Sequence, residues 1–219
     1  MNRCRDRNSY RTVSHKSSTT FYTGQVTTAL TRTPSKLIVA EVRGAALSIL
    51  DEEGPDGFTV RAIAKRAHVA PMAIYNHFDG VNGVLEALWT EGFEALRQAI
   101  TFHSGDPLWD LVSAGRGYRS FALSNRGLYT VMFMHRFRNF HPTVGAEHLA
   151  AQTYQTLVVN IERCQRLGYF SNIRASDGAQ ILWSACHGYV ALELLDITFA
   201  SDRDETFERL LAALRDGFR

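Results

Sequence analysis

The sequence has few of the features that mark secreted proteins and metalloproteins. Cysteine is scarce and odd in number: Cys4, Cys164 and Cys186 form no CxxC pair. Their number and spacing argue against a disulfide framework and a cysteine zinc site, and they fit a reducing compartment. No apolar signal core follows the basic start. We therefore expect a cytoplasmic protein.

The sequence also lacks the motifs of common catalytic sites. It contains no nucleophile elbow, no HExxH and no phosphate-binding glycine loop, since no Lys–Ser/Thr follows "GPDG" at 54–57. Cys186 precedes His187, but adjacent residues of a helix point away from each other. We predict that the protein is not an enzyme and uses no cofactor.

Histidine is the remaining candidate for metal binding. The residues concerned are His103, His135, His141, His148 and His187. His141 and His148 would share a face only if one helix held both, and Pro142 is expected to start that helix after His141. No cysteine or carboxylate completes a ligand pattern, so we predict no metal site.

One long apolar stretch, 179–200, has to be assigned either to a membrane or to a protein interface. It reads "AQILWSACHGYVALELLDITFA" and is interrupted by His187, Glu193 and Asp196. A membrane span would rarely carry all three without partners. A helix that is apolar nearly all round must be covered on both sides, so we expect a buried interface helix.

The net charge of +2 conceals an uneven distribution. Residues 1–36 carry seven basic side chains against Asp6 alone, a net of +6, which leaves −4 for the remainder. The first 33 residues are rich in Ser, Thr and Arg without periodicity, so we expect a disordered basic tail. Two interpretations of it remain: it contacts a polyanionic partner, or it has no role.

From Lys36 onward the pattern is helical, and the predicted fold class is all-α. A helix ends at Gly54; Thr59 is a good N-cap for a short helix ending near Ala67; Pro71 suits the first position of the next helix, which "FDGVNG" (78–83) ends. The later helices are expected near 84–100, 107–124, 126–138, 143–168, 176–199 and 203–218.

The two short helices around the turn at 68–70, with a preceding helix to brace them, predict a helix-turn-helix unit. Ile74, Phe78 and Val69 would face inward. The outward positions would then meet DNA bases, and their flanking polar groups would meet phosphates. The alternative is a small packed helix, which would have to bury Asn76 and His77 in succession at a cost.

The segment "TVRAIAKRAHVAPMAIYNHF", preceded by "AALSILDEEG" and followed by "GVLEAL", resembles the DNA-binding domain of the tetracycline-repressor (TetR) family. The resemblance covers about residues 37–90. The remainder is more weakly similar to one branch of the family's ligand-binding domains, through "WSACHG" (Trp183, His187, Gly188) and "YRSFALSNRGLYTVMF". The resemblance as a whole implies a homodimeric repressor that a small molecule releases from its operator.

The resemblance also implies roles for individual residues. Thr59, Tyr75 and His77 match phosphate contacts, and Arg61 matches a position that reaches a base in some members. The variable base-facing positions correspond to Pro71, Met72, Ala73 and Asn76.

Three positions depart from the family pattern. Ala70 replaces a capping polar residue, His68 replaces the usual turn glycine, and Val81 stands where a lysine often grips phosphate. We therefore expect weaker and less salt-sensitive DNA binding from this domain.

The C-terminal aromatic residues are either plain core or the lining of a ligand cavity, because such cavities are mostly apolar. The predicted ligand-binding residues are Trp109, Phe133, Phe137, Tyr154, Trp183 and His187. A lipophilic, uncharged or weakly charged effector is expected, and His187 could instead be a packed core histidine.

The predicted organisation is a tail (1–36), a helix-turn-helix domain (37–91) and an effector-binding and dimerisation domain (92–219). The helices near 176–199 and 203–218 would form the dimer interface as a four-helix bundle. The alternative to a ligand-responsive repressor is a helical ligand-binding or scaffold protein with weakened DNA binding, suggested by Ala70 and Val81.

Overall fold

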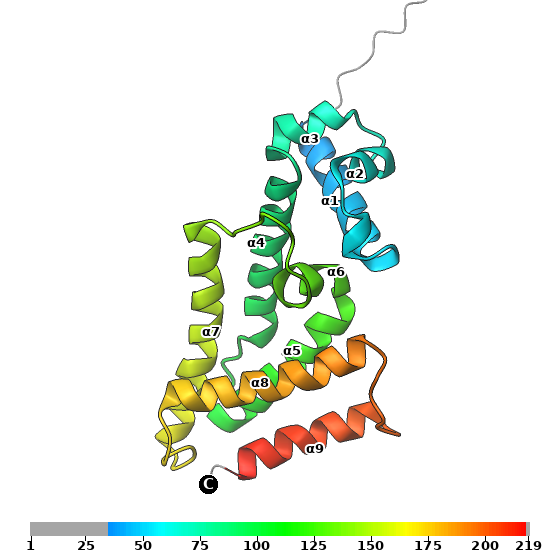
Figure 1. The fold of residues 1–219 in the computed structure, drawn as a ribbon. Helices are drawn as coiled ribbons and strands as arrows, with labels where there is room; N and C mark the ends of the chain where they lie inside the picture. The colour runs from blue at the N-terminus through cyan, green and yellow to red at the C-terminus, as the bar shows by residue number, and fades with distance from the viewer. Residues whose placement is uncertain (1–34, 218–219) are drawn as a thin grey trace, which may run out of the picture. The chain divides into compact units, whose positions relative to one another are not determined.

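The computed structural model describes residues 35–217, and all regular structure within that range is helical, as predicted (Figure 1). The predictions for the basic tail lie outside the described residues. The helices are α1 (Ser35–Glu52), α2 (Val60–Arg66), α3 (Pro71–Phe78), α4 (Val81–Ile100), α5 (Pro107–Ser124), α6 (Arg126–Tyr129), α7 (Val144–Gln165), α8 (Ala175–Leu194) and α9 (Arg203–Asp216).

The helix-turn-helix forms for the reasons visible in the sequence. The Thr59 hydroxyl accepts a hydrogen bond from the Ala62 backbone N–H at 3.2 Å and so caps α2. His68 adopts a left-handed conformation with φ of 53° in the turn. Pro71 begins α3, and the fully buried Ile74 holds α3 against the domain core. These features confirm the predicted turn between two short helices.

The start of α4 differs from the prediction. The helix begins at Val81 and not near Val84, so "VNG" forms its first turn. Asp79, with φ of 59°, and Gly80, with φ of 90°, reverse the chain immediately after α3. Gly83 allows the reversal to be so short, because a Cβ there would lie 1.4 Å from the Phe78 carbonyl oxygen.

Two C-terminal helices end earlier than expected. The predicted helix 126–138 is α6 followed by a π-helical turn, Thr130–Met134, after which His135 is extended. The predicted helix 176–199 ends at Leu194, because Asp196 is left-handed with φ of 55° and the Ile197 N–H closes the end on the Leu192 carbonyl. Ile197 and Phe199 therefore lie exposed in the following loop.

The C-terminal helices surround one another in a bundle. Helices α4, α5 and α7 pack together, α8 lies against α5 and α7, and α9 against α5 and α8 (Figure 1). The short α6 packs on α1 as well as on α4 and α5. Its Gly127 lies so close to α1 that a Cβ would meet the Leu47 side chain and the Asp51 carboxylate. Helices α4 and α6 therefore both connect the helix-turn-helix to the bundle.

A buried ion pair ties α5, α8 and α9 together. Arg119 of α5 donates to both carboxylate oxygens of Glu193 on α8, at 2.7 and 2.8 Å. It also pairs with Asp204 on α9 and lies over the Phe207 ring. The Glu193 side chain is only 6% exposed, so this pair is shielded from water.

Among the described helices, none is both long enough and apolar enough to cross a membrane.

Candidate functional site

Helix α3 presents most of its predicted DNA-contacting residues to solvent. Pro71, Met72, Tyr75 and Asn76 are exposed, with Met72 64% and Tyr75 53% accessible. Ala73 and His77 are half-buried. Exposure of a large thioether and a phenol side by side on a short helix leaves apolar surface open to a partner.

Helix α2 contributes one exposed arginine and one that forms salt bridges. Arg61 is exposed, next to the capping residue Thr59. Arg66 instead bonds Ser48 and the carboxylates of Glu52 and Glu53, and so fastens α2 to α1. Of these two cations, Arg61 is the one positioned for an external anion.

A contact that the sequence did not predict joins the start of α1 to α3. The Ser35 hydroxyl lies 3.2 Å from Nδ1 of His77, across 42 residues of sequence. This contact depends on how α1 crosses α3, so it cannot be predicted from a local sequence pattern. It brings the first turn of α1 next to the predicted phosphate-contacting histidine.

The departures from the family pattern have visible structural consequences. Ala70 occupies the N-cap of α3 and has no side-chain oxygen with which to cap it. Val81 is half-buried and packs against the hydrophobic core, so this position carries no phosphate-binding cation. The expected weakening of DNA binding stays a prediction.

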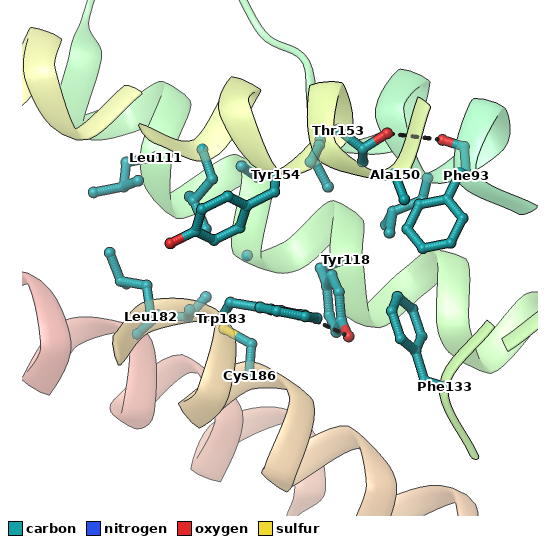
Figure 2. Close-up of a pocket in the computed structure, with 16 residues that line it drawn as sticks. Phe93, Leu111, Tyr118, Phe133, Ala150, Thr153, Tyr154, Leu182, Trp183 and Cys186 are labelled. Carbon is teal, nitrogen blue, oxygen red and sulfur yellow. Dashed lines mark hydrogen bonds between the residues drawn. The ribbon is translucent and has the colours of Figure 1, made fainter. Parts of the chain in front are cut away.

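The C-terminal bundle contains a partly open, apolar cavity of about 150 Å³ (Figure 2). Phe93, Leu96 and Ile100 of α4 form one side of it, and α5, α7 and α8 supply most of the rest. The complete lining is Phe93, Leu96, Ile100, Leu111, Ala114, Gly115, Tyr118, Phe133, Ala150, Thr153, Tyr154, Leu157, Leu182, Trp183, Cys186 and Leu211. This set includes no Asp, Glu, Lys, Arg or His from the described chain.

Three of the six predicted ligand-binding residues line this cavity. Phe133, Tyr154 and Trp183 are among its walls (Figure 2). The Trp183 ring lies between the other two, with its centroid 6.0 Å from that of Phe133 and 5.9 Å from that of Tyr154. Their assignment to an effector stays a prediction.

The other three predicted residues are not part of the lining. Trp109 is 49% exposed and packs edge-on against Phe102. On α5 the face turned to the cavity carries Leu111, Ala114, Gly115 and Tyr118, with helical spacing that leaves Trp109 outside it.

Phe137 and His187 lie behind the cavity wall for different reasons. Phe137 follows the π-helical turn and packs against Phe58 and His135. His187 lies one turn after the lining residue Trp183 on the same face of α8, but the Tyr118 hydroxyl of α5 lies against its ring nitrogen, 2.9 Å away.

His187 belongs instead to a hydrogen-bonded cluster with two tyrosines. Its Nδ1 lies 2.7 Å from the Tyr129 hydroxyl oxygen and 2.9 Å from that of Tyr118, and the two hydroxyls are 2.9 Å apart. The indole N–H of Trp183 donates to the Tyr118 oxygen at 3.3 Å. The cluster joins α8 and α5 to the end of α6.

Burial keeps this cluster uncharged at neutral pH. It raises the pKa of the Tyr118 hydroxyl to about 12 and raises that of Tyr129 as well. It lowers the pKa of the His187 imidazole below its usual value. Neutral imidazole can accept a proton-donating hydroxyl at Nδ1, which suits the short contact to Tyr129.

Sequence reasoning missed most of the aliphatic wall and Tyr118. The aliphatic residues of the wall belong to the apolar faces of four helices: Leu96, Ala114, Leu157 and Leu182. The helical period of such a face does not distinguish a filled core from a hollow one. Tyr118 lies in the segment "YRSFALSNRGLYTVMF" that carried part of the resemblance, which was the available signal.

Within residues 35–217, no group of three or more histidine, cysteine, aspartate or glutamate side chains is placed to hold a metal ion.

Comparison with known proteins places both halves of the chain in one family. Residues 43–88 match the family model "Bacterial regulatory proteins, tetR family", and residues 111–214 match "Tetracyclin repressor-like, C-terminal domain". The likeness to one branch of the family through Trp183, His187 and Gly188 stays a prediction.

Individual relatives agree with these matches. The chain is 26% identical over 152 residues to the uncharacterized helix-turn-helix transcriptional regulator YobS of Bacillus subtilis, covering 68% of this chain and 74% of that one. A Rhodococcus protein of unknown function shares the fold, with a TM-score of 0.71 at 22% identity over 83% of this chain and 95% of the other. A variant tetracycline repressor of Acinetobacter baumannii, solved with minocycline, has a TM-score of 0.58 at 26% identity, covering 81% and 93%. The chain therefore belongs to the tetracycline-repressor (TetR) family of ligand-responsive, DNA-binding transcriptional regulators.

Proposed function

We propose that the chain is a homodimeric repressor that leaves its operator when a small, uncharged, lipophilic molecule occupies the cavity between α4, α5, α7 and α8. The position of α4 carries this proposal. Its first turn lies directly against the end of α3, and residues near its other end line the cavity. A ligand that moves α4 therefore moves the helix that would read DNA.

The exposed face of the helix-turn-helix supports DNA as the partner. We assign phosphate contacts to Thr59, Tyr75 and His77 and a base contact to Arg61. The base-facing surface would consist of Pro71, Met72, Ala73 and Asn76. The residues assigned to phosphates offer hydroxyl and imidazole donors, so the electrostatic part of binding is expected to be small.

The outer face of α8 supports homodimerisation. Five residues at helical spacing are all exposed in the single chain: Ile181, Ser184, Gly188, Leu192 and Leu195. A stripe of small and apolar residues suits close packing of a second helix. We propose that α8, together with α9, forms a four-helix bundle with the partner subunit. The resulting pair of α3 helices would meet two half-sites about 34–36 Å apart.

The dimer can be tested without DNA. Gly188→Arg is suitable because the residue is exposed and a Cβ there meets no described atom within 4 Å, so we expect the single subunit to fold with it. We expect sedimentation to report a monomer for this variant and a dimer for the wild type. Ser171→Arg, exposed in the loop before α8, is the control and should remain dimeric.

We also propose that the protein works in the cytoplasm and has no catalytic activity.

The alternative function is that of a helical ligand-binding or scaffold protein whose DNA binding has weakened, as Ala70 and Val81 suggest. A gel shift with the DNA immediately upstream of its own gene separates the repressor from this alternative. Specific binding by the wild type, lost in Arg61→Ala and kept in Arg166→Ala, would support the repressor. Both arginines are exposed, but Arg166 lies at the end of α7. Failure of the wild type to bind this DNA specifically would favour the alternative.

A further inference from the structure

The chemistry of the cavity wall defines a narrow class of ligand, and the inference rests on the proposed function of this cavity. The wall contains five aromatic rings, from Phe93, Tyr118, Phe133, Tyr154 and Trp183. Three successive ring pairs, Phe93–Phe133, Phe133–Trp183 and Trp183–Tyr154, have centroids 5.5 to 6.0 Å apart at steep mutual angles. A guest ring can extend such an edge-to-face series, which favours an aromatic guest over an aliphatic one.

The hydroxyl groups of the wall already have partners within the protein. The Thr153 hydroxyl donates to the Leu149 carbonyl at 2.9 Å, and the Tyr154 hydroxyl donates to the Ser176 carbonyl at 2.8 Å. The Tyr118 oxygen accepts from Trp183 (Figure 2). It also contacts Tyr129 and His187. The Thr153 and Tyr154 hydrogens are therefore already donated, so the oxygen of a ligand hydroxyl or carbonyl would receive no hydrogen bond from them and would be buried at a cost.

A charge on the ligand is disfavoured more strongly than an uncharged polar group. The described lining holds no ionisable cation or carboxylate, and burial raises the pKa of the Cys186 thiol to about 12, which keeps it neutral. A carboxylate or ammonium ligand would lose its hydration without gaining a counter-ion.

Size sets the last limit. An apolar protein cavity of roughly 150 Å³ accepts a molecule the size of benzene, and this cavity has that volume. We propose that its ligand is an uncharged aromatic compound of a single ring with at most small alkyl substituents and no hydrogen-bonding group. Toluene is a suitable probe.

The binding test uses the full chain without DNA. Toluene is added in sealed cells, and binding is followed by the rise in melting temperature and by ligand-observed NMR. We expect toluene to bind at least about tenfold more tightly than p-cresol, since the hydroxyl of p-cresol would be buried without a matching donor. Methylcyclohexane and naphthalene should also bind more weakly than toluene, and benzoate should not bind. Equal or tighter binding of p-cresol, benzoate, methylcyclohexane or naphthalene would overturn the proposed class.

Two substitutions locate the site. Ala150→Leu places a larger side chain in the cavity and should weaken toluene binding at least about tenfold. Its neighbour Ala151 is exposed on the same helix, and Ala151→Leu should bind as the wild type does. If Ala150→Leu does not fold, Leu157→Ala gives an independent answer, because the enlarged cavity should now prefer naphthalene. Leu167→Ala, at an exposed leucine, is its control. Unchanged selectivity in the folded cavity variants would place toluene elsewhere and refute the assignment.

A last measurement separates this inference from the proposed function. Toluene is added to the complex of the chain with its upstream DNA. Release of the DNA at concentrations that saturate the cavity would support both. Selective binding without release would leave the ligand class of the cavity in place and contradict its role as the effector site.

Discussion

The Tyr129 hydroxyl lies 2.7 Å from Nδ1 of His187, and this contact joins α6, which packs on the DNA-binding domain, to α8, which lines the cavity. Both side chains sit behind Trp183 and Phe133, with ring centroids of His187 6.1 and 5.3 Å from theirs. A change of position in the cavity wall therefore reaches α6 through one layer of side chains. His187 holds this layer together without lining the cavity.

The stability of the protein should depend on the charge state of His187. Burial lowers the pKa of its imidazole, whereas in the unfolded chain the pKa is about 6.5. Below about pH 6.5 the unfolded chain binds a proton that the folded chain does not, so the free energy of unfolding falls as the pH drops towards the folded pKa. The contribution is fully present only above the unfolded pKa.

His187→Gln removes this proton uptake and keeps a polar side chain. Unfolding by urea from about pH 8 to about pH 5, across the range where histidine titrates, should show the wild type losing stability relative to the variant as the pH falls. All other histidines are common to both proteins and cancel. Parallel pH profiles would show that His187 does not titrate in this way.

Gly83 should be far less replaceable than its sequence context suggests. A Cβ at position 83 would lie 1.4 Å from the Phe78 carbonyl oxygen, so Gly83→Ala must push α3 and α4 apart. We expect a loss of at least about 3 kcal/mol in the free energy of unfolding, the upper part of the range for overpacking.

The matched substitution is Gly44→Ala, also within a helix. A Cβ there meets no described atom within 4 Å, and the residue is exposed. Alanine is a better helix former than glycine, so this variant should be more stable by about 0.5–1 kcal/mol. Similar effects of the two substitutions in a denaturant titration would contradict the close approach of α3 and α4.

Two of the salt bridges that α5 forms across the bundle should differ in strength because they differ in burial. Arg119 pairs with Glu193 and Arg116 pairs with Glu208, each through two hydrogen bonds of 2.7 to 2.8 Å. The Glu193 side chain is 6% exposed and that of Glu208 is 46% exposed. Glu193→Ala leaves a shielded guanidinium with Asp204 as its remaining partner and should cost about 3 kcal/mol.

Glu208→Ala should cost at most about 1 kcal/mol, and this small effect should shrink further in high salt. Chemical denaturation of both variants at low and high salt measures the difference. If Glu208→Ala were as destabilising as Glu193→Ala, burial would not be what distinguishes the two pairs.

The helix-turn-helix could be predicted from the sequence because the residues that start and end its helices act on their immediate neighbours. Thr59 caps its own helix, Pro71 starts the next, and His68 marks the left-handed turn, so each can be recognised from a few neighbouring residues. Gly83 was misinterpreted for the same reason: in sequence it resembles a helix breaker, but its role depends on a backbone atom of the preceding helix.

The cavity required information that periodicity does not contain. Trp183 and His187 are one turn apart and both half-buried, yet only Trp183 reaches the cavity, because α5 places Tyr118 in front of His187. The buried pair of Arg119 and Glu193 likewise joins residues 74 positions apart. Such relationships depend on helix crossing, which an apolar stripe leaves undetermined.

Sequence readout by α3 is the last prediction. Asn76 is exposed on α3, and an asparagine amide can pair with both N6 and N7 of adenine in the major groove. Asn76→Ala should weaken binding to the preferred operator by about 1–3 kcal/mol and relax the preference at one A·T position in each half-site. Tyr75→Phe removes only a hydroxyl assigned to phosphate, so it should weaken binding to all sequences nearly equally.

Asn172→Ala, at an exposed asparagine in the loop before α8, is the control and should change neither affinity nor base preference. Binding to a library of single-base operator variants measures all three proteins together. If Asn76→Ala kept the wild-type base preference while losing affinity, Asn76 would contact the DNA backbone, and sequence readout would fall to Met72, Ala73 and Arg61.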